Sequence, residues 1–198
     1  MKNIKLKNEL LKLFYEANKN FLINHMSNIL NDVSERNLCA QLSMEINLLL
    51  KKYDFQGYYS DPEYNRNGLD VKKTICAVGL EPQAIVCDLI VHSRGEKQKD
   101  NLLAIEMKKT NNCDENDINN DRARLKALTK QECDEYFELG ENLFPKNVCL
   151  YELGIMYILD IRRKLITYEI YVDGEKVGDE TDSFDEMMNY TEDSFKFL

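Results

Sequence analysis

The stretch IVCDLIVHSRGEKQKDNLLAIEMKK, residues 85–109, decides the fold. Residues 84–92 are rich in β-branched and other apolar side chains and predict a strand. Residues 101–108 predict a second strand of the same kind. The loop between them, residues 93–100, is charged and contains Gly95, so we expect the two strands to form an antiparallel hairpin.

Three charged residues interrupt these apolar strands. Asp88 lies in the first strand, and Glu106 and Lys108 lie two residues apart in the second, which places both on one face of the sheet. The hairpin brings Asp88 alongside them, so two carboxylates and an amine converge. A carboxylate among apolar neighbours needs a partner, a metal or an open end of the sheet. Carboxylate oxygens suit Mg²⁺ or Mn²⁺.

These groups predict metal-dependent chemistry on a phosphate ester. A metal held by Asp88 and Glu106 would neutralise charge on the scissile phosphate and lower the pKa of its bound water. Lys108 would orient that water or stabilise the developing charge, and Glu35 would complete the metal shell, directly or through water. The alternative is a plain ion pair between Lys108 and one carboxylate. The metal site is favoured because each charged group interrupts an apolar segment at a spacing that suits a hairpin.

The rest of the chain predicts helices on both sides of a mixed sheet. Apolar spacing predicts a helix over 4–31, and Ser34 begins a second helix that reaches about Lys52 and carries Glu35 in its first turn. The remaining expectations are a strand at 55–61, a loop at 110–120, a helix at 121–129, a central strand at 149–160, a hairpin from 165–172 through Asp173-Gly174, and a weak helix or mobile acidic tail at 179–198. The order helix, strand, strand, strand, helix, strand predicts an α/β core at 34–175, a helical extension at 1–33 and an acidic tail at 176–198.

Composition limits the functional classes. The net charge of -9 counts against a large non-specific nucleic-acid surface, although a local basic cleft stays open. The six cysteines form no CxxC pair, so they predict reduced thiols in a reducing compartment rather than a zinc site. The apolar runs are too short to span a membrane, and the N-terminus does not resemble a secretory signal. We therefore expect a cytoplasmic protein.

Residues 85–109 resemble the core of the PD-(D/E)xK nuclease superfamily, which has the restriction-endonuclease-like fold. The Ser34-Glu35-Arg36 helix start, the segment 61–66 and the segment 121–129 are similar to the parts of uncharacterised bacterial members that precede and follow this core. Cys87 stands where the motif has proline. The resemblance implies a three-layer αβββαβ core and metal-dependent phosphodiester hydrolysis. It also implies catalytic roles for Asp88, Glu106 and Lys108, with a further role for Glu35.

The expected substrate is DNA, and cutting of both strands would favour a homodimer. Four basic residues are candidates for contact with its phosphates, namely Arg66, Arg122, Arg124 and Lys126. The alternative for Arg66 is a solvated loop, and for the other three it is charge pairing on the helix surface. A second hypothesis for the whole chain is a catalytically silent nuclease-like module that binds or regulates within a defence or mobile-element system.

Overall fold

The predicted hairpin lies in the middle of a mixed β-sheet. A computed structural model describes residues 4–64, 66–67, 71–72, 74–75, 83–84, 86–112, 114–131, 136–139, 142–145 and 150–191, with the backbone alone at 66–67, 71–72, 74–75, 83–84, 112, 136–139 and 142–145. The main sheet has the strand order β1-β6-β7-β10-β11-β12. Its strands are β1 (Tyr59–Pro62), β6 (Leu89–His92), β7 (Asn101–Lys109), β10 (Leu153–Asp160), β11 (Leu165–Val172) and β12 (Glu175–Ser183).

The strand directions make the sheet mixed. β1 pairs antiparallel with β6, and β6 pairs antiparallel with β7. β7 and β10 are parallel, so the chain must cross over one face of the sheet between them. The strands β10, β11 and β12 then form an antiparallel meander to the far edge.

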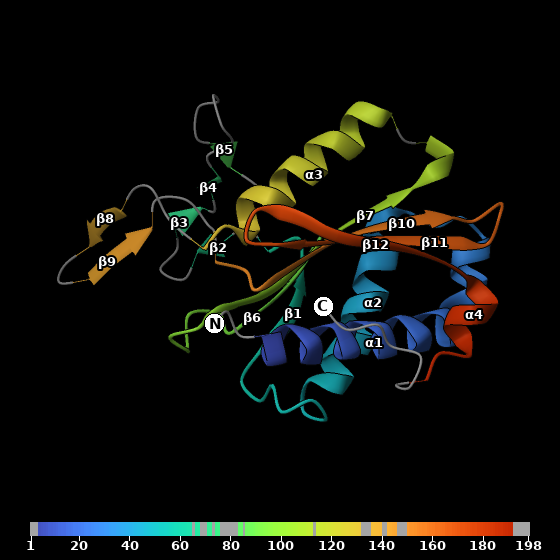
Figure 1. Ribbon diagram of the computed structural model, residues 1–198, viewed down its shortest axis with the longest axis horizontal. Helices are drawn as coiled ribbons and strands as arrows, with labels where there is room; N and C mark the ends of the chain where they lie inside the picture. The colour runs from blue at the N-terminus through green and yellow to red at the C-terminus, as the bar shows by residue number, and fades with distance from the viewer. Residues whose placement is uncertain are drawn as a thin grey trace.

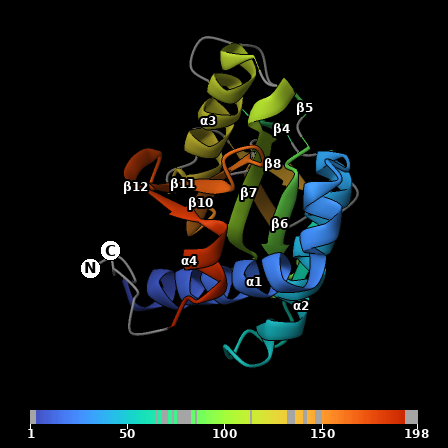
Figure 2. The same cartoon turned by 90° about the vertical axis from the view of Figure 1, so that its right-hand side faces the viewer.

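Helices cover both faces of this sheet, as Figures 1 and 2 show. The long helix α1 (Ile4–Leu30), α2 (Glu35–Leu50) and the short α4 (Phe184–Met188) lie on one face. The crossover helix α3 (Glu115–Thr129) lies on the other, after the single turn η1 (Thr110–Asn112). The described part of the chain is thus an α/β protein with a six-stranded mixed sheet and four α-helices.

Alternation along β7 separates the two faces. Leu103, Ile105 and Met107 belong to the larger core cluster, which includes α1 and α2. Ala104 belongs to the smaller cluster, which includes Leu125 and Leu128 of α3. Because side chains in a strand alternate between faces, Glu106 and Lys108 lie on the α3 face. The charged pair is therefore placed under the one helix that covers that face.

In the described ranges, three pairs of short strands lie outside the main sheet. They are β2 (Arg66–Asn67) with β3 (Val71–Lys72), β4 (Thr74–Ile75) with β5 (Gln83–Ala84), and β8 (Tyr136–Leu139) with β9 (Asn142–Pro145). Figure 1 shows them away from α1 and α2.

Helix α1 is joined to the sheet by buried polar contacts as well as by apolar ones. Asn18 donates from Nδ2 to the Tyr168 hydroxyl at 2.7 Å and accepts from the Tyr157 hydroxyl at 2.6 Å. Lys7 Nζ lies 3.0 Å from Glu152 Oε2, and both side chains are buried. These contacts satisfy polar groups that would otherwise be unpaired in the core.

Most predicted elements are present with shorter bounds. The helices at 4–31 and from Ser34, the 93–100 loop with its hairpin, the central strand within 149–160 and the hairpin through Asp173-Gly174 are confirmed. The strand expected at 55–61 begins only at Tyr59. The strand expected at 84–92 begins at Leu89, so Asp88 lies one residue before β6 rather than inside it. Its carboxylate accepts the backbone N–H of Met107, which ties this bend to β7.

One prediction about a polar segment was wrong, and another was right only in part. The loop expected at 110–120 contains the first residues of α3, because Asp114 caps the helix by accepting the backbone N–H of Asn116. The segment 179–198, expected as a weak helix or mobile tail, begins with the end of β12 and contains a helix only as the short α4. An edge strand pairs on one side only, so its acidic side chains can stay in water, and charge there discourages pairing between molecules.

Two cysteines can be compared with the expectation of reduced thiols. Cys39 and Cys87 are buried and free of disulfides, whereas Cys76, Cys113, Cys133 and Cys149 lie outside the described residues. None of the helices in the described ranges is long and apolar enough to cross a membrane.

Candidate active site

The hairpin brings Asp88 and Glu106 to facing positions. Leu89 of β6 pairs with Ile105 of β7, and because the strands are antiparallel, Asp88 and Glu106 are the next facing residues. Asp88 is half-buried, and its Oδ2 accepts the backbone N–H of Met107 at 2.8 Å. This bond holds the Asp88 carboxylate beside the C-terminal part of β7.

Glu106 is a fully buried carboxylate with one free oxygen. Its Oε1 accepts a hydrogen bond from Nε of Arg124 at 2.8 Å, and its Oε2 is buried with no hydrogen-bond partner among the described residues. Burial and then the negative charge of Asp88 raise the pKa of Glu106 to about 8, against the opposing effect of Arg124. An unpaired buried carboxylate oxygen is unfavourable by itself, so Glu106 is poised to accept a cation or a proton.

Lys108 lies between two acidic residues. Its Nζ is 2.9 Å from Oδ2 of Asp121 and 3.9 Å from Oε2 of Glu35. Burial would lower the pKa of Lys108, but the Asp121 hydrogen bond and the surrounding carboxylates raise it overall. Lys108 is therefore held as a cation, which suits electrostatic stabilisation rather than proton abstraction at neutral pH.

Asp121 belongs to the site, although it is not among the site residues predicted from the sequence. It is buried and contacts both Lys108 and Arg124. The sequence carries a signal for this, because Asp121 lies four residues before Leu125 and seven before Leu128, on the apolar stripe of the helix. An acidic residue on such a stripe indicates a buried partner on the sheet.

Glu35 reaches the site from the opposite layer. It is the first residue of α2, after the N-cap Ser34, whose side chain accepts the backbone N–H of Asn37. Oε1 of Glu35 accepts the backbone N–H of Lys109 at 2.9 Å, while Oε2 faces Lys108. Glu35 thus lies beyond Lys108 along β7.

The carboxylates of the site can be related to the ligands that a divalent metal requires. Within the described ranges, no group of three or more His, Cys, Asp or Glu side chains is gathered closely enough to hold a metal ion. Asp88 and Glu106 form a facing pair, and Glu106 offers an unpaired oxygen. Mg²⁺ is commonly bound by one or two carboxylates plus water and substrate phosphates. The Asp88–Glu106 pair fits such a metal.

The four basic residues predicted to contact phosphate differ in their surroundings. Arg122 makes two hydrogen bonds to Glu169, at 2.8 and 2.6 Å, and Lys126 lies 3.3 Å from Glu175. Arg124 contacts Glu106 and Asp121. The side chain of Arg66 lies outside the described residues, although its backbone belongs to β2. All three described candidates are therefore already paired with acids.

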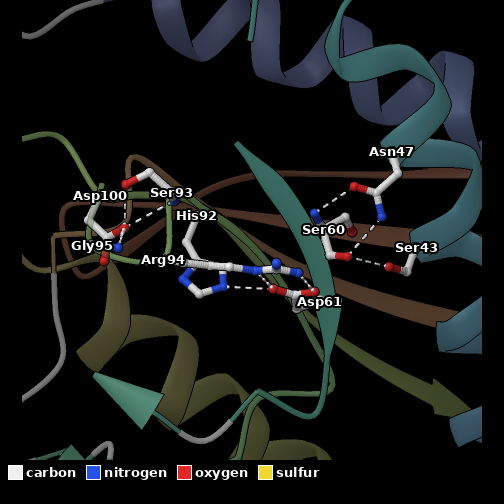
Figure 3. A network of polar contacts seen from close by, with 9 residues as sticks. All are labelled: Ser43, Asn47, Ser60, Asp61, His92, Ser93, Arg94, Gly95 and Asp100. Carbon is white, nitrogen blue, oxygen red and sulfur yellow. Dashed lines mark hydrogen bonds and ion pairs between the residues drawn. The ribbon is translucent and has the colours of Figure 1, made fainter. Parts of the chain in front are cut away.

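A second polar network lies along β1, shown in Figure 3. Asp61 accepts two hydrogen bonds from Arg94 and lies 3.1 Å from Nε2 of the buried His92. Burial would raise the pKa of Asp61, but the bonds from Arg94 and His92 lower it. Further along β1, Ser43 and Asn47 of α2 bind the backbone of Ser60. The network attaches the edge strand to α2 and to the 93–100 loop.

Comparisons with family models, with curated proteins and with solved structures found no match. The class of protein is therefore inferred from the fold and its side chains: an α/β protein with a carboxylate pair and a lysine at the centre of a mixed sheet.

Proposed function

We propose that this chain is a metal-dependent nuclease that hydrolyses phosphodiester bonds in DNA, with its site at Asp88, Glu106, Lys108 and Glu35. One observation carries the proposal: the fully buried Glu106 keeps an unpaired oxygen beside Asp88, two residues from a lysine held as a cation. A purely structural ion pair would leave no such oxygen, because an unpaired buried carboxylate lowers stability.

The order of the elements supports the same proposal. The succession α2, β1, β6, β7, α3, β10 gives the neighbouring strands β1-β6-β7-β10, with the last parallel to β7. This is in keeping with the helix, three strands, helix, strand order implied by the resemblance to the PD-(D/E)xK superfamily. Asp88 then precedes the second strand of that core, and Glu106 and Lys108 lie in its third.

Asp88 and Glu106 would hold the metal, Mg²⁺ or Mn²⁺. When bound, such a metal supplies charge neutralisation on the scissile phosphate and a water of lowered pKa. Glu106 would use the oxygen that Arg124 leaves free, and Arg124 would offset the charge of the other oxygen. Glu35 would act through water, since the carboxylates do not form a close group of three.

Lys108 would contribute a fixed positive charge to the reaction. Asp121 and Glu35 lie on either side of its ammonium group and restrict where it can point. In that position the ammonium group orients the attacking water or stabilises charge that develops on the phosphate oxygens. Asp121 is therefore a positioning residue.

Cleavage assays test the proposal. Single- and double-stranded DNA is incubated with Mg²⁺ or Mn²⁺ and wild type, Asp88→Ala or Lys108→Ala, with Asp117→Ala as an exposed acidic control on α3. We expect metal-dependent cutting by wild type and the control only. Metal-dependent cutting that survives both site substitutions would contradict the assignment. Products cut in both strands would favour a two-fold dimer.

A second candidate function has its own supporting observation. Arg122, Arg124 and Lys126 are all paired with acids, and the chain carries a net charge of -9. These facts favour a silent nuclease-like module that binds or regulates within a defence or mobile-element system. A Mn²⁺ titration discriminates, because no binding by wild type at millimolar concentration would favour this module over the enzyme.

A further inference from the structure

A surface depression of about 300 Å³ lies where β7 and β10 end. Its lining comes from η1 and from the turn between β10 and β11, namely Thr110, Asn111, Asp160, Arg162 and Arg163. Figures 1 and 2 show η1 and this turn at the same end of the sheet. The depression thus lies at the carboxyl ends of the two parallel strands.

The depression continues the face that carries Glu106 and Lys108. Lys108 pairs with Ile158 in the parallel register. Two residues later, Asp160 ends β10 and Thr110 begins η1. Side chains two residues apart share a face, and two residues of strand span about 7 Å. Asp160 therefore shares the α3 face with Ile158, and the depression that it lines begins two residues beyond Lys108 along the chain.

The arginines of the depression are less fully paired with acids than the basic side chains on α3. Arg163 is anchored to Asp160, from its backbone N–H to Oδ1 at 3.0 Å and from Nε to Oδ2 at 3.9 Å, yet its side chain is 79% exposed. Arg162 is exposed and has no ion pair among the described residues. Two guanidinium groups face one carboxylate here, so the depression can still take an anion.

We propose that this depression binds a backbone phosphate of the nucleic acid, adjacent to the phosphate at Lys108. Guanidinium groups bind phosphate through paired N–H donors, and a threonine hydroxyl and an asparagine amide add neutral donors. The proposal rests on the proposed nuclease function and names how its substrate is held. The strand runs from the Asp88–Glu106 site past Lys108 to Arg162 and Arg163.

Fluorescence anisotropy with labelled single-stranded DNA and EDTA measures binding without cleavage. Arg162→Ala and Arg163→Ala are each expected to weaken binding roughly five-fold and to reduce the slope of log affinity against log salt by about 0.7, the loss of one phosphate contact. Lys164→Ala is the matched control, because Lys164 lies exposed in the same turn but does not line the depression. Arg162→Lys is expected to recover part of the loss.

Several outcomes would overturn the proposal. Unchanged affinity in both arginine variants would do so, as would an equal loss in Lys164→Ala, which would indicate general electrostatics. By contrast, displacement of the DNA by millimolar inorganic phosphate from wild type but not from the arginine variants would support the proposal, because free phosphate and DNA phosphate would then compete for the depression. A parallel cleavage assay separates the two proposals. If the arginine substitutions do not affect cutting, the nuclease proposal holds and the subsite proposal fails. If DNA binding needs the arginines but no metal-dependent cutting occurs, the nuclease proposal fails.

Discussion

Arg124 and Glu106 share a contact that leaves one carboxylate oxygen open. Nε of Arg124 donates to Oε1 of Glu106 at 2.8 Å, while Oε2 of the same buried carboxylate has no partner in the described part of the chain. The guanidinium group comes from the crossover helix and the carboxylate from a central strand. The packing of α3 on the sheet therefore determines which Glu106 oxygen is paired. The Arg124 contact lowers the pKa of Glu106, whereas burial and the nearby Asp88 carboxylate raise it.

The first prediction concerns Glu106 and stability in EDTA. The pKa of Glu106 is raised in the folded state to about 8, so folding favours its protonated form. That contribution is full below the ordinary pKa of 4.5 and is lost as the pH rises through about 8. Glu106→Gln should thus be more stable than wild type at pH 8.5, by about 1–3 kcal/mol, and equal to it near pH 4.5. Urea unfolding at several pH values checks this, with exposed Glu96→Gln as control. A pH-independent difference would contradict the account.

Asp121 provides a second prediction. Removing it leaves Lys108 and Arg124 without a shared acidic partner, so Asp121→Ala should lower the free energy of unfolding by about 1–3 kcal/mol. Cleavage should fall as well, because Lys108 loses its anchor. The exposed Asp117→Ala should change stability by less than about 0.5 kcal/mol. Urea unfolding and single-turnover cleavage measure both effects, and full activity in Asp121→Ala would refute the positioning role.

Substitution of Lys108 should lower the cleavage rate without weakening metal binding. Lys108→Gln removes a positive charge that acts on the reacting phosphate, so we expect roughly a 100-fold loss of the cleavage rate. Its Mn²⁺ affinity should be unchanged or tighter, because the lost charge repelled the metal. Calorimetry and single-turnover kinetics give the two values, with the exposed Lys97→Gln as control. Loss of Mn²⁺ binding in Lys108→Gln would instead indicate a structural role.

Lys7 tests the attachment of α1 to the sheet. Lys7 and Lys99 both pair with the buried Glu152, so Lys7→Ala leaves that carboxylate with one partner. We expect a loss of about 1–3 kcal/mol in unfolding free energy, against less than about 0.5 kcal/mol for exposed Lys5→Ala. Unfolding in urea measures both, and equal effects would show that the buried pair contributes little.

The hairpin could be predicted from sequence because its signals are local. Two apolar strands flank a charged loop, and Asp88, just before β6, lies at a spacing from Glu106 that a hairpin aligns. The start of α3 could not be placed in the same way, since its Asn- and Asp-rich first turn has the composition of a loop. Only the cap at Asp114 marks the boundary.

The contacts that shape the site were harder to predict because they join distant segments. Arg124 was a candidate for phosphate contact or for charge pairing on the helix surface, yet α3 packs on β7 and β10 so that this side chain contacts the buried Glu106. Asp121 likewise meets Lys108 through the packing of α3. The depression at Arg162 and Arg163 depends on the parallel register of β7 and β10, which no local pattern in the sequence fixes.

The most direct test of the central claim is the anomalous difference map of a crystal soaked in millimolar Mn²⁺. We predict a peak between the carboxylates of Asp88 and Glu106, with the free oxygen of Glu106 as a ligand, and its loss in a crystal of Asp88→Asn. A map of wild type with no peak at this pair, or with Mn²⁺ bound only elsewhere, would contradict the account.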